Sequence, residues 1–254
     1  MGEIGRKISL VLLLIDDFTN CVIRDTSVSV YTEKEKKHSI RKSEGYHVFC
    51  DLEQNPVRIC MESGLYQKQV VELPLSYGEE VSQIRMIPAK GYPIPAGATC
   101  IRGTLQPGTR LRIFFPEQKK SYKLLYDYDP SSQGNRIALF QQDALCLEGR
   151  ILCIKNKECQ EFFKVTGQQE EVCRMEQPLQ KAYKKIGTSI YPVHEAFAGA
   201  DGSIYLPIRM RSEEMQQCSF MIFSEGEEYC GTWILRPGKE NWITEEFQIK
   251  KEEG

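Results

Sequence analysis

Short runs in which apolar and polar residues alternate at every second position constrain this chain more than any other feature. Residues 26–31, 46–52 and 57–62 each show the alternation, which sends successive side chains to opposite faces of a β-strand. Turn-forming clusters separate the runs, among them residues 16–20 and 53–56. No window in this region has a convincing helical repeat. The pattern therefore predicts an all-β chain of small sandwich domains.

One parity of the strand expected over residues 46–52 is richer in apolar side chains. It comprises Tyr46, Val48, Cys50 and Leu52. We expect this parity to face the core and His47 to leave the opposite face, because neighbours in a strand alternate. The apolar parity of the next strand comprises Val57, Ile59 and Met61. Cys60 falls on its charged parity.

The apolar run over residues 8–15 is predicted to be a buried strand. Asp16 and Asp17 follow it at once, without a small-residue cleavage site. The run is also much shorter than the roughly 20 apolar residues of a membrane helix. We therefore expect no signal peptide, no membrane partner and a cytoplasmic location. In that reducing compartment the ten cysteines are expected to be unpaired thiols.

Turn signals and strand patterns divide the chain into three expected parts. Residues 1–80 are predicted to form an N-terminal β-sandwich. Residues 81–142 are predicted to be a middle β segment, which begins with a Pro/Gly-rich connection at residues 91–97 that cannot continue a ladder. Residues 143–254 are predicted to form a C-terminal sandwich-like domain.

The middle segment contains a predicted hairpin that joins residues 122–128 to residues 136–140 through a polar tip. One parity of its first strand comprises Tyr122, Leu124, Tyr126 and Tyr128. Buried, this row is a sandwich core; exposed, it is a stacking platform for sugar rings or for a partner's surface. The candidate partner-contact residues lie on this strand and at the tip. They are Tyr126, Tyr128, Asp129 and Asn135.

The sequence lacks the residue patterns of catalytic and cofactor chemistry. Its three histidines, His38, His47 and His194, are scattered. His47 and Cys50 leave opposite faces of one strand, which argues against a zinc site there. No nucleophile elbow, P-loop or dinucleotide-binding glycine run occurs. We therefore expect a protein that is not an enzyme, without catalytic residues, metal or cofactor. A formal net charge of −2 also argues against a nucleic-acid partner.

Three parts of the chain resemble carboxypeptidase-regulatory-like, or transthyretin-like, domains. The first match covers residues 44–52, 57–61 and 64–66, with residues 54–56 in place of the family's usual Pro-Gly turn. Residues 147–151 resemble the family's opening strand. Residues 196–207 resemble its Asp-Gly hairpin, because Asp-Gly tolerates the positive φ of tight turns. The resemblance implies tandem seven-stranded Greek-key sandwiches that act as accessory or adhesive modules.

Two shorter segments resemble proteins of phage-tail-like contractile particles. They are residues 14–19 (LIDDFT) and residues 92–99 (YPIPAGAT). This resemblance implies a tail, baseplate or cap accessory protein that resides in the bacterial cytoplasm before release. The leading hypothesis is thus a non-catalytic structural, assembly or protein-binding module whose partner is another protein. The alternatives are a carbohydrate-binding or adhesive sandwich and an accessory domain of an enzyme, and the oligomeric state stays open.

Overall fold

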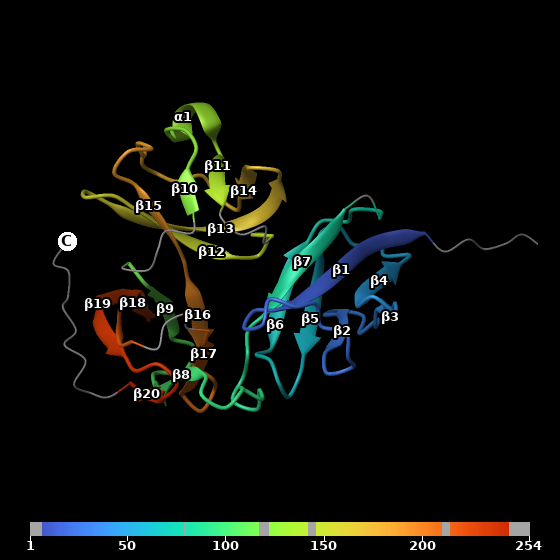
Figure 1. The fold of residues 1–254 in the computed structure, drawn as a ribbon. Coiled ribbons are helices and arrows are strands. Elements are labelled where there is room, and N and C mark those ends of the chain that lie inside the picture. The colour runs from blue at the N-terminus through green and yellow to red at the C-terminus, as the bar shows by residue number, and fades with distance from the viewer. Residues whose placement is uncertain (1–6, 79, 117–121, 142–145, 210–213, 244–254) are drawn as a thin grey trace, which may run out of the picture. The chain divides into compact units, whose positions relative to one another are not determined.

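A computed structural model of the chain describes residues 7–78, 80–116, 122–141, 146–209 and 214–243. The described residues are strands, turns and one short helix, so the prediction of an all-β chain is confirmed (Figure 1). The chain divides into two compact units, Met1–Ile94 and Pro95–Gly254. No helix among the described residues is long and apolar enough to cross a membrane.

The first unit contains two sheets, of four and three strands. The four-stranded sheet has the order β3-β4-β1-β7, and the three-stranded sheet has the order β2-β5-β6. The strands are β1 (Ile8–Asp16), β2 (Ser29–Thr32), β3 (Ile40–Arg41), β4 (Tyr46–Cys50), β5 (Val57–Glu62), β6 (Gln69–Leu73) and β7 (Val81–Met86). Strands β1 and β7 pair in parallel, and the other neighbours are antiparallel.

The predicted opening strand is confirmed as β1. Leu10, Leu12 and Leu14 alternate along it and are fully buried, as a strand with one face on the core requires. On β5 the predicted core residues Ile59 and Met61 are likewise fully buried.

The face assigned to β4 from the sequence is wrong. In the antiparallel pair with β1, Leu10 is the register partner of Phe49 and Leu12 is the partner of His47. His47 and Phe49 therefore share the face of the buried leucines, and His47 is only 3% exposed. Val48 is also buried, but on the opposite face. Both parities of this strand carry an aromatic ring, so pairing with β1 decides the face and a shift of one residue reverses it.

Cys60 is a smaller departure from the expected pattern. It lies on the predicted charged parity of β5 but is buried, between its register partners Tyr31 of β2 and Val70 of β6. No disulfide joins any two of the ten cysteines in the structure.

Two sheets of the second unit form a sandwich with one shared core. One sheet has the order β16-β9-β18-β19 and the other has the order β17-β8-β20. Their strands are β8 (Thr99–Thr104), β9 (Arg110–Phe114), β16 (His194–Phe197), β17 (Ser203–Ile208), β18 (Gln216–Ser224), β19 (Glu227–Leu235) and β20 (Glu240–Trp242). The core combines Ile101 of β8 with Leu111 of β9, Leu206 of β17 and Phe220 of β18.

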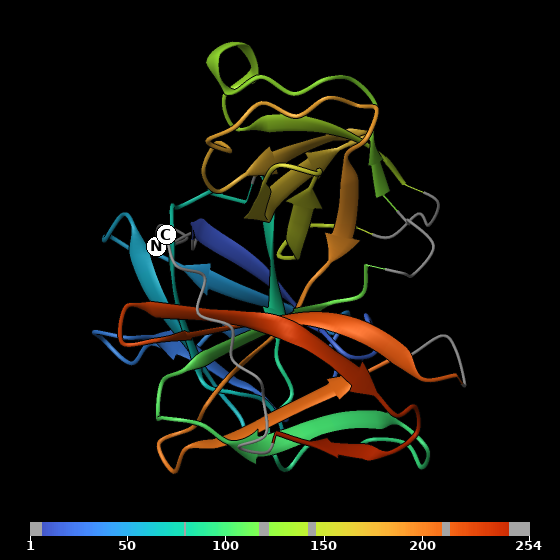
Figure 2. The ribbon, with the colours of Figure 1, turned by 90° about the vertical axis from the view of Figure 1, so that its left-hand side faces the viewer.

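The remaining strands of the second unit close into a six-stranded barrel of order β10-β11-β14-β13-β12-β15 (Figure 2). They are β10 (Tyr122–Leu124), β11 (Arg136–Gln141), β12 (Ile151–Lys155), β13 (Gln160–Gln169), β14 (Val172–Met175) and β15 (Ser189–Pro192). Helix α1 (Pro130–Gln133) lies between β10 and β11. Inward-facing side chains fill a barrel of this small size, and here they form one apolar cluster.

The barrel is an insertion in the sandwich. Strands β9 and β16 are antiparallel neighbours, with Ile113 opposite His194, yet every barrel strand lies between them in the chain. A second small cluster, formed by Phe114, Cys153 and Tyr191 with Phe162 packed against it, joins the two parts.

Strand pairing distributes the predicted middle segment over several sheets. Strand β7 pairs with β1, β8 and β9 belong to the sandwich, and β10 and β11 belong to the barrel. The predicted hairpin is confirmed as the antiparallel pair β10–β11.

The segment around Asp201–Gly202 does not form the predicted hairpin. Gly202 has the expected positive φ of 75°, but β16 and β17, which flank it, pair in different sheets. The Asp-Gly turn therefore carries the chain from one sheet to the other.

Candidate functional site

The predicted contact residues lie near α1, at one end of the barrel, and the structure separates them into two groups. Tyr128 is 2% exposed and belongs to the barrel core. Its hydroxyl donates to the carbonyl of Gly134 at 2.6 Å and accepts from the amide of Leu179 at 3.2 Å. Burial raises the pKa of this hydroxyl. Tyr128 therefore has no surface to offer a partner, and its assignment as a contact residue is corrected to a core residue.

Asp129 and Asn135 fix the shape of the tip. Asp129 caps α1, because its Oδ1 accepts from the amide and the hydroxyl of Ser131 at 2.9 and 2.6 Å. These hydrogen bonds lower the pKa of the Asp129 carboxyl. The Asn135 side chain donates to the carbonyl of Met175 at 3.3 Å. The predicted polar tip is thus a capped helical turn with defined hydrogen bonds.

Tyr126 is the predicted contact residue whose side chain is largely exposed to solvent. It shares its parity with the buried residues Tyr122, Leu124 and Tyr128, but β10 ends at Leu124 and the alternation ends with it. Tyr126 is 68% exposed, and Ile186, on the loop that precedes β15, is 91% exposed. Both side chains are therefore open to contact from solvent.

Asp127 ties the loops of Tyr126 and Ile186 together. Its Oδ1 accepts from the amide of Lys185 at 2.7 Å, and its Oδ2 pairs with Lys184 Nζ at 3.0 Å. Both bonds lower the pKa of the Asp127 carboxyl, the backbone bond most strongly. We call the two loops that Asp127 ties together, with Tyr126, Asp127, Lys184, Lys185 and Ile186, the barrel-end patch.

Two backbone hydrogen bonds between the buried residues Tyr128 and Tyr183, at 2.8 and 2.9 Å, also join these two loops. The patch is therefore presented on a rigid base. Sequence reasoning missed Ile186, and the available signal was a lone isoleucine between two lysines and a glycine in a polar loop.

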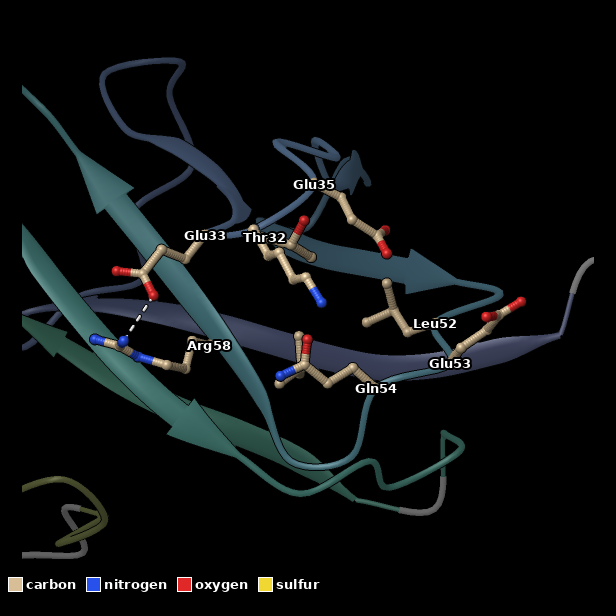
Figure 3. A pocket seen from close by; sticks show the side chains of 9 residues that line it. Thr32, Glu33, Glu35, Leu52, Glu53, Gln54 and Arg58 are labelled. Atoms are coloured by element: carbon tan, nitrogen blue, oxygen red, sulfur yellow. Dashed lines mark ion pairs between the residues drawn. The ribbon is translucent and has the colours of Figure 1, made fainter.

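A pocket of about 350 Å³ lies in the first unit (Figure 3). The end of β2 and the turn after it contribute Thr32, Glu33 and Glu35, and the β4–β5 connection contributes Leu52 to Gln54. Lys37 Nζ fastens that connection by donating to the carbonyls of Cys50 and Asp51 at 2.6 and 3.1 Å.

The pocket is lined by charged side chains of both signs, including Lys34, and by the aliphatic side chains of Leu52 and Val57. Glu33 and Arg58 pair across it at 2.8 Å, as the dashed line in Figure 3 marks. Glu35 and Glu53 add further carboxylates, and Val57 supplies a buried apolar contact. Such a lining suits a small polar ligand that offers hydrogen-bond donors.

The three histidines have separate surroundings. His47 Nδ1 lies 2.9 Å from Ser39 Oγ, and burial, with a smaller contribution from the charge of Arg41, lowers its pKa to about 4. His38 stacks at a tilt on Tyr31, and His194 packs edge-on against Phe115. In the residues that the structure describes, no group of three or more His, Cys, Asp or Glu could hold a metal ion.

An exposed tryptophan beside an arginine, which sequence reasoning missed, lies on the sandwich, where the neighbouring Tyr205 is buried. Trp242 of β20 is the register partner of Arg102 of β8, and Tyr205 of β17 is the partner of Arg102 on its other side. Arg102 lies over the Tyr205 ring at 5.1 Å and pairs with Glu240 at 2.9 Å. Trp242 is 57% exposed. Only the pairing of three strands distant in sequence brings these side chains together, so no local pattern could reveal this arrangement.

Comparisons with known proteins assign the chain to no family. No family model matches it, and no curated protein matches it. Among solved structures, the crystal structure of a putative carbohydrate binding protein from Bacteroides uniformis aligns over 91% of this chain and 100% of its own, with 9% identity and a TM-score of 0.27. That score is too low for the alignment to carry an argument about fold or function.

Proposed function

We propose that this chain is a non-catalytic protein-binding module that contacts its partner through the barrel-end patch. The observation that carries the proposal is the exposure of Tyr126 and Ile186 on two loops that Asp127 joins. Tyrosine anchors supply a large contact area at low entropic cost. A rigid base adds to this, because little further order must be imposed on binding. Catalysis is not part of the proposal. His47 does lie 2.9 Å from the hydroxyl of Ser39, but the residue is only 3% exposed, and no group that could hold a metal ion occurs among the described residues.

The proposal extends to the identity of the partner and to the family of the first domain. The partner is expected to be a protein of a contractile, phage-tail-like particle, and nucleic acid and membrane are not expected as partners. Residues 1–80 are proposed to be kin to transthyretin-like sandwich modules.

Quantitative co-purification from the native cell tests the proposal. The double variant Tyr126→Ser/Ile186→Ser should lose the partner, because removing an anchor costs about 2 kcal/mol or more of binding energy, roughly 30-fold in affinity. Tyr77→Ser/Ile234→Ser is the matched control, since it removes the same two residue types from exposed positions elsewhere. Equal recovery of the partner with both double variants would reject the barrel-end patch. Steady turnover of any glycan, peptide or ester would reject the non-catalytic assignment.

A second candidate function, glycan binding, is favoured by the exposed Trp242 and its register partner Arg102. A sugar ring stacks on a flat aromatic side chain, and an ion pair such as Arg102–Glu240 offers a donor and an acceptor side by side for neighbouring hydroxyls. A panel of neutral oligosaccharides should then quench or shift tryptophan fluorescence, since one of the two tryptophans in the chain is the exposed Trp242. Trp242→Ala should abolish the response and Trp242→Phe should retain the binding. Absence of binding to the whole panel would reject this candidate.

A further inference from the structure

Arginine and aromatic side chains form a row on the outer face of the β16-β9-β18-β19 sheet. Leu111 and Ile113 of β9 face the sandwich core, so Arg110 and Arg112, which alternate with them, leave the opposite face. Arg110 lies between Phe197 of β16 and Phe223 of β18 as the register partner of both. We call Phe197, Arg110 and Phe223 the guanidinium row.

The carboxylate of Glu195 pairs with both arginines, but at unequal distances. Glu195 Oε2 lies 2.7 Å from Arg112 Nε but 3.9 Å from Arg110 Nε. Arg112 also lies between two rings, at 5.0 Å from the centre of Phe162 and 5.3 Å from the centre of Phe223. Glu195 therefore accepts a hydrogen bond from Arg112 and lies too far from Arg110 Nε for a second one.

Arg110 is left with an unmet demand for an acceptor. Its Nε is buried, and the described residues provide no hydrogen-bond partner for it. Burial and the neighbouring charge of Arg112 lower the pKa of Arg110, against the opposing effect of Glu195 and the more distant Glu228. A buried donor without an acceptor is unfavourable, and a charge beside a like charge is unfavourable as well.

The ring of Phe223 fixes how Arg110 can meet a ligand. The guanidinium carbon lies 4.3 Å from the ring centre, so the ring covers one face of the planar group. An arginine held in this way offers its N–H edge, and that edge matches the two oxygens of a carboxylate. Phe197 is an exposed apolar surface on the other side of Arg110, where an apolar part of the ligand can pack.

From this geometry we infer that the guanidinium row binds a carboxylate carried on an apolar or aromatic group, with Arg110 as the binding residue and Phe197 as the apolar contact. The carboxylate would bind the part of the Arg110 guanidinium group that reaches solvent, because the side chain is 35% exposed although its Nε is buried. The site is separate from the barrel-end patch, and its test requires no partner protein.

Titration of the purified full chain with 3-phenylpropionate tests the inference. The readout is the set of arginine Nε–Hε signals in two-dimensional NMR, with the Arg110 signal assigned by its loss in Arg110→Lys. We expect the Arg110 signal to shift and to saturate. Binding should weaken about tenfold or more, equivalent to 1.4 kcal/mol, in Arg110→Gln and for the neutral analogue 3-phenylpropionamide. Phe197→Ser should weaken 3-phenylpropionate while leaving acetate unchanged, and Arg174→Gln, an exposed arginine of the barrel, should have no effect.

Three results would overturn the inference. The first is the absence of any shift of the Arg110 signal up to the solubility limit of the probe. The second is equal binding of the acid and the amide, because the carboxylate would then contribute nothing. The third is binding of inorganic phosphate as tight as that of 3-phenylpropionate, because the site would then select neither the carboxylate nor its apolar carrier.

Discussion

The hydroxyl of Tyr92 donates a hydrogen bond of 2.6 Å to Oδ2 of Asp16, which lies 76 positions earlier in the chain. Tyr66 donates to the same oxygen at 2.9 Å, and the amides of Phe18 and Thr19 donate to Oδ1 at 2.8 and 2.9 Å. Four donors therefore satisfy one buried carboxylate. This cluster joins residues 14–19 to Tyr92, at the start of the second of the two segments that suggested a particle protein.

Asp16→Asn should destabilise the first unit by about 2–4 kcal/mol, because an amide group presents donors to donors and leaves buried hydrogen bonds unmade. Tyr92→Phe removes one bond and should cost about 1–2 kcal/mol. Both tryptophans of the chain lie in the second unit, so tryptophan fluorescence does not follow the stability of the first unit. Hydrogen exchange of peptides from β1 and β5 measures that stability locally. Unchanged exchange in Asp16→Asn would contradict a structural role for the cluster.

His47 should make the first unit sensitive to acid. Its pKa is lowered to about 4 in the folded chain from about 6.5 in an unfolded one. The unfolded state therefore takes up the proton first, and stability that is complete above pH 6.5 is lost as the pH falls towards 4. The loss amounts to at most about 3 kcal/mol.

His47→Gln should flatten this part of the stability profile, measured by hydrogen exchange between pH 7 and pH 4. His38→Gln is the matched control on the exposed histidine and should follow the wild type. The same slope in His47→Gln and wild type would show that other groups produce the acid sensitivity.

The corrected face of β4 gives a direct comparison of two neighbours. His47→Asp and Val48→Asp should each cost several kcal/mol, because each places a carboxylate in a buried position. A mild effect of His47→Asp beside a severe effect of Val48→Asp would favour the strand face first expected from the sequence.

Sequence patterns were sufficient where one face of a strand is plainly apolar. Leu10, Leu12 and Leu14 specify β1, and the pair β10–β11 follows from two apolar runs around a turn. The patterns were insufficient for β4, where both faces are apolar, and for the Asp201–Gly202 turn, where local chemistry fixes a bend but not the sheet of the next strand. Closure of the barrel and its insertion between β9 and β16 depend on pairing between strands far apart in the sequence. A short stretch of sequence carries no information about such pairing.

The candidate site was predicted in the same uneven way. The hairpin and its exposed Tyr126 were found, but Tyr128 was misplaced because parity alone does not show where β10 ends. Ile186, Arg110 and Trp242 owe their surroundings to strands or loops far away in the sequence, and so they were missed.

Tyr126 and Tyr128 should differ in stability measurements. Tyr128→Phe removes the hydroxyl that bridges Gly134 and Leu179 and should cost about 1–2 kcal/mol, whereas Tyr128→Ala should cost about 3–5 kcal/mol through the cavity that it leaves. Tyr126→Ala should change stability by less than about 0.5 kcal/mol. Tryptophan fluorescence in urea follows the second unit, and equal midpoints for Tyr126→Ala and Tyr128→Ala would contradict the assigned burial.

The cysteines should differ in their rates of alkylation. Burial raises the pKa of Cys153 and of Cys218 to about 12, so almost none of either thiol is ionised at pH 8. In the native chain Cys21, which is exposed, should react early and these two last. After unfolding without reductant, intact mass should show at least about eight labels if the thiols are unpaired. Fewer labels would mean that several cysteines are paired.

Site-specific photocrosslinking from position 126 in the native cell shows whether the barrel-end patch contacts a partner protein. A benzoylphenylalanine in place of Tyr126 keeps an exposed aromatic group at the barrel-end patch, and the same substitution at Tyr77 is the control. We expect one dominant crosslinked protein from position 126, absent from position 77 and reduced by Ile186→Ser. Crosslinks that are absent from position 126, or identical from both positions, would contradict the claim that this end of the barrel binds a partner.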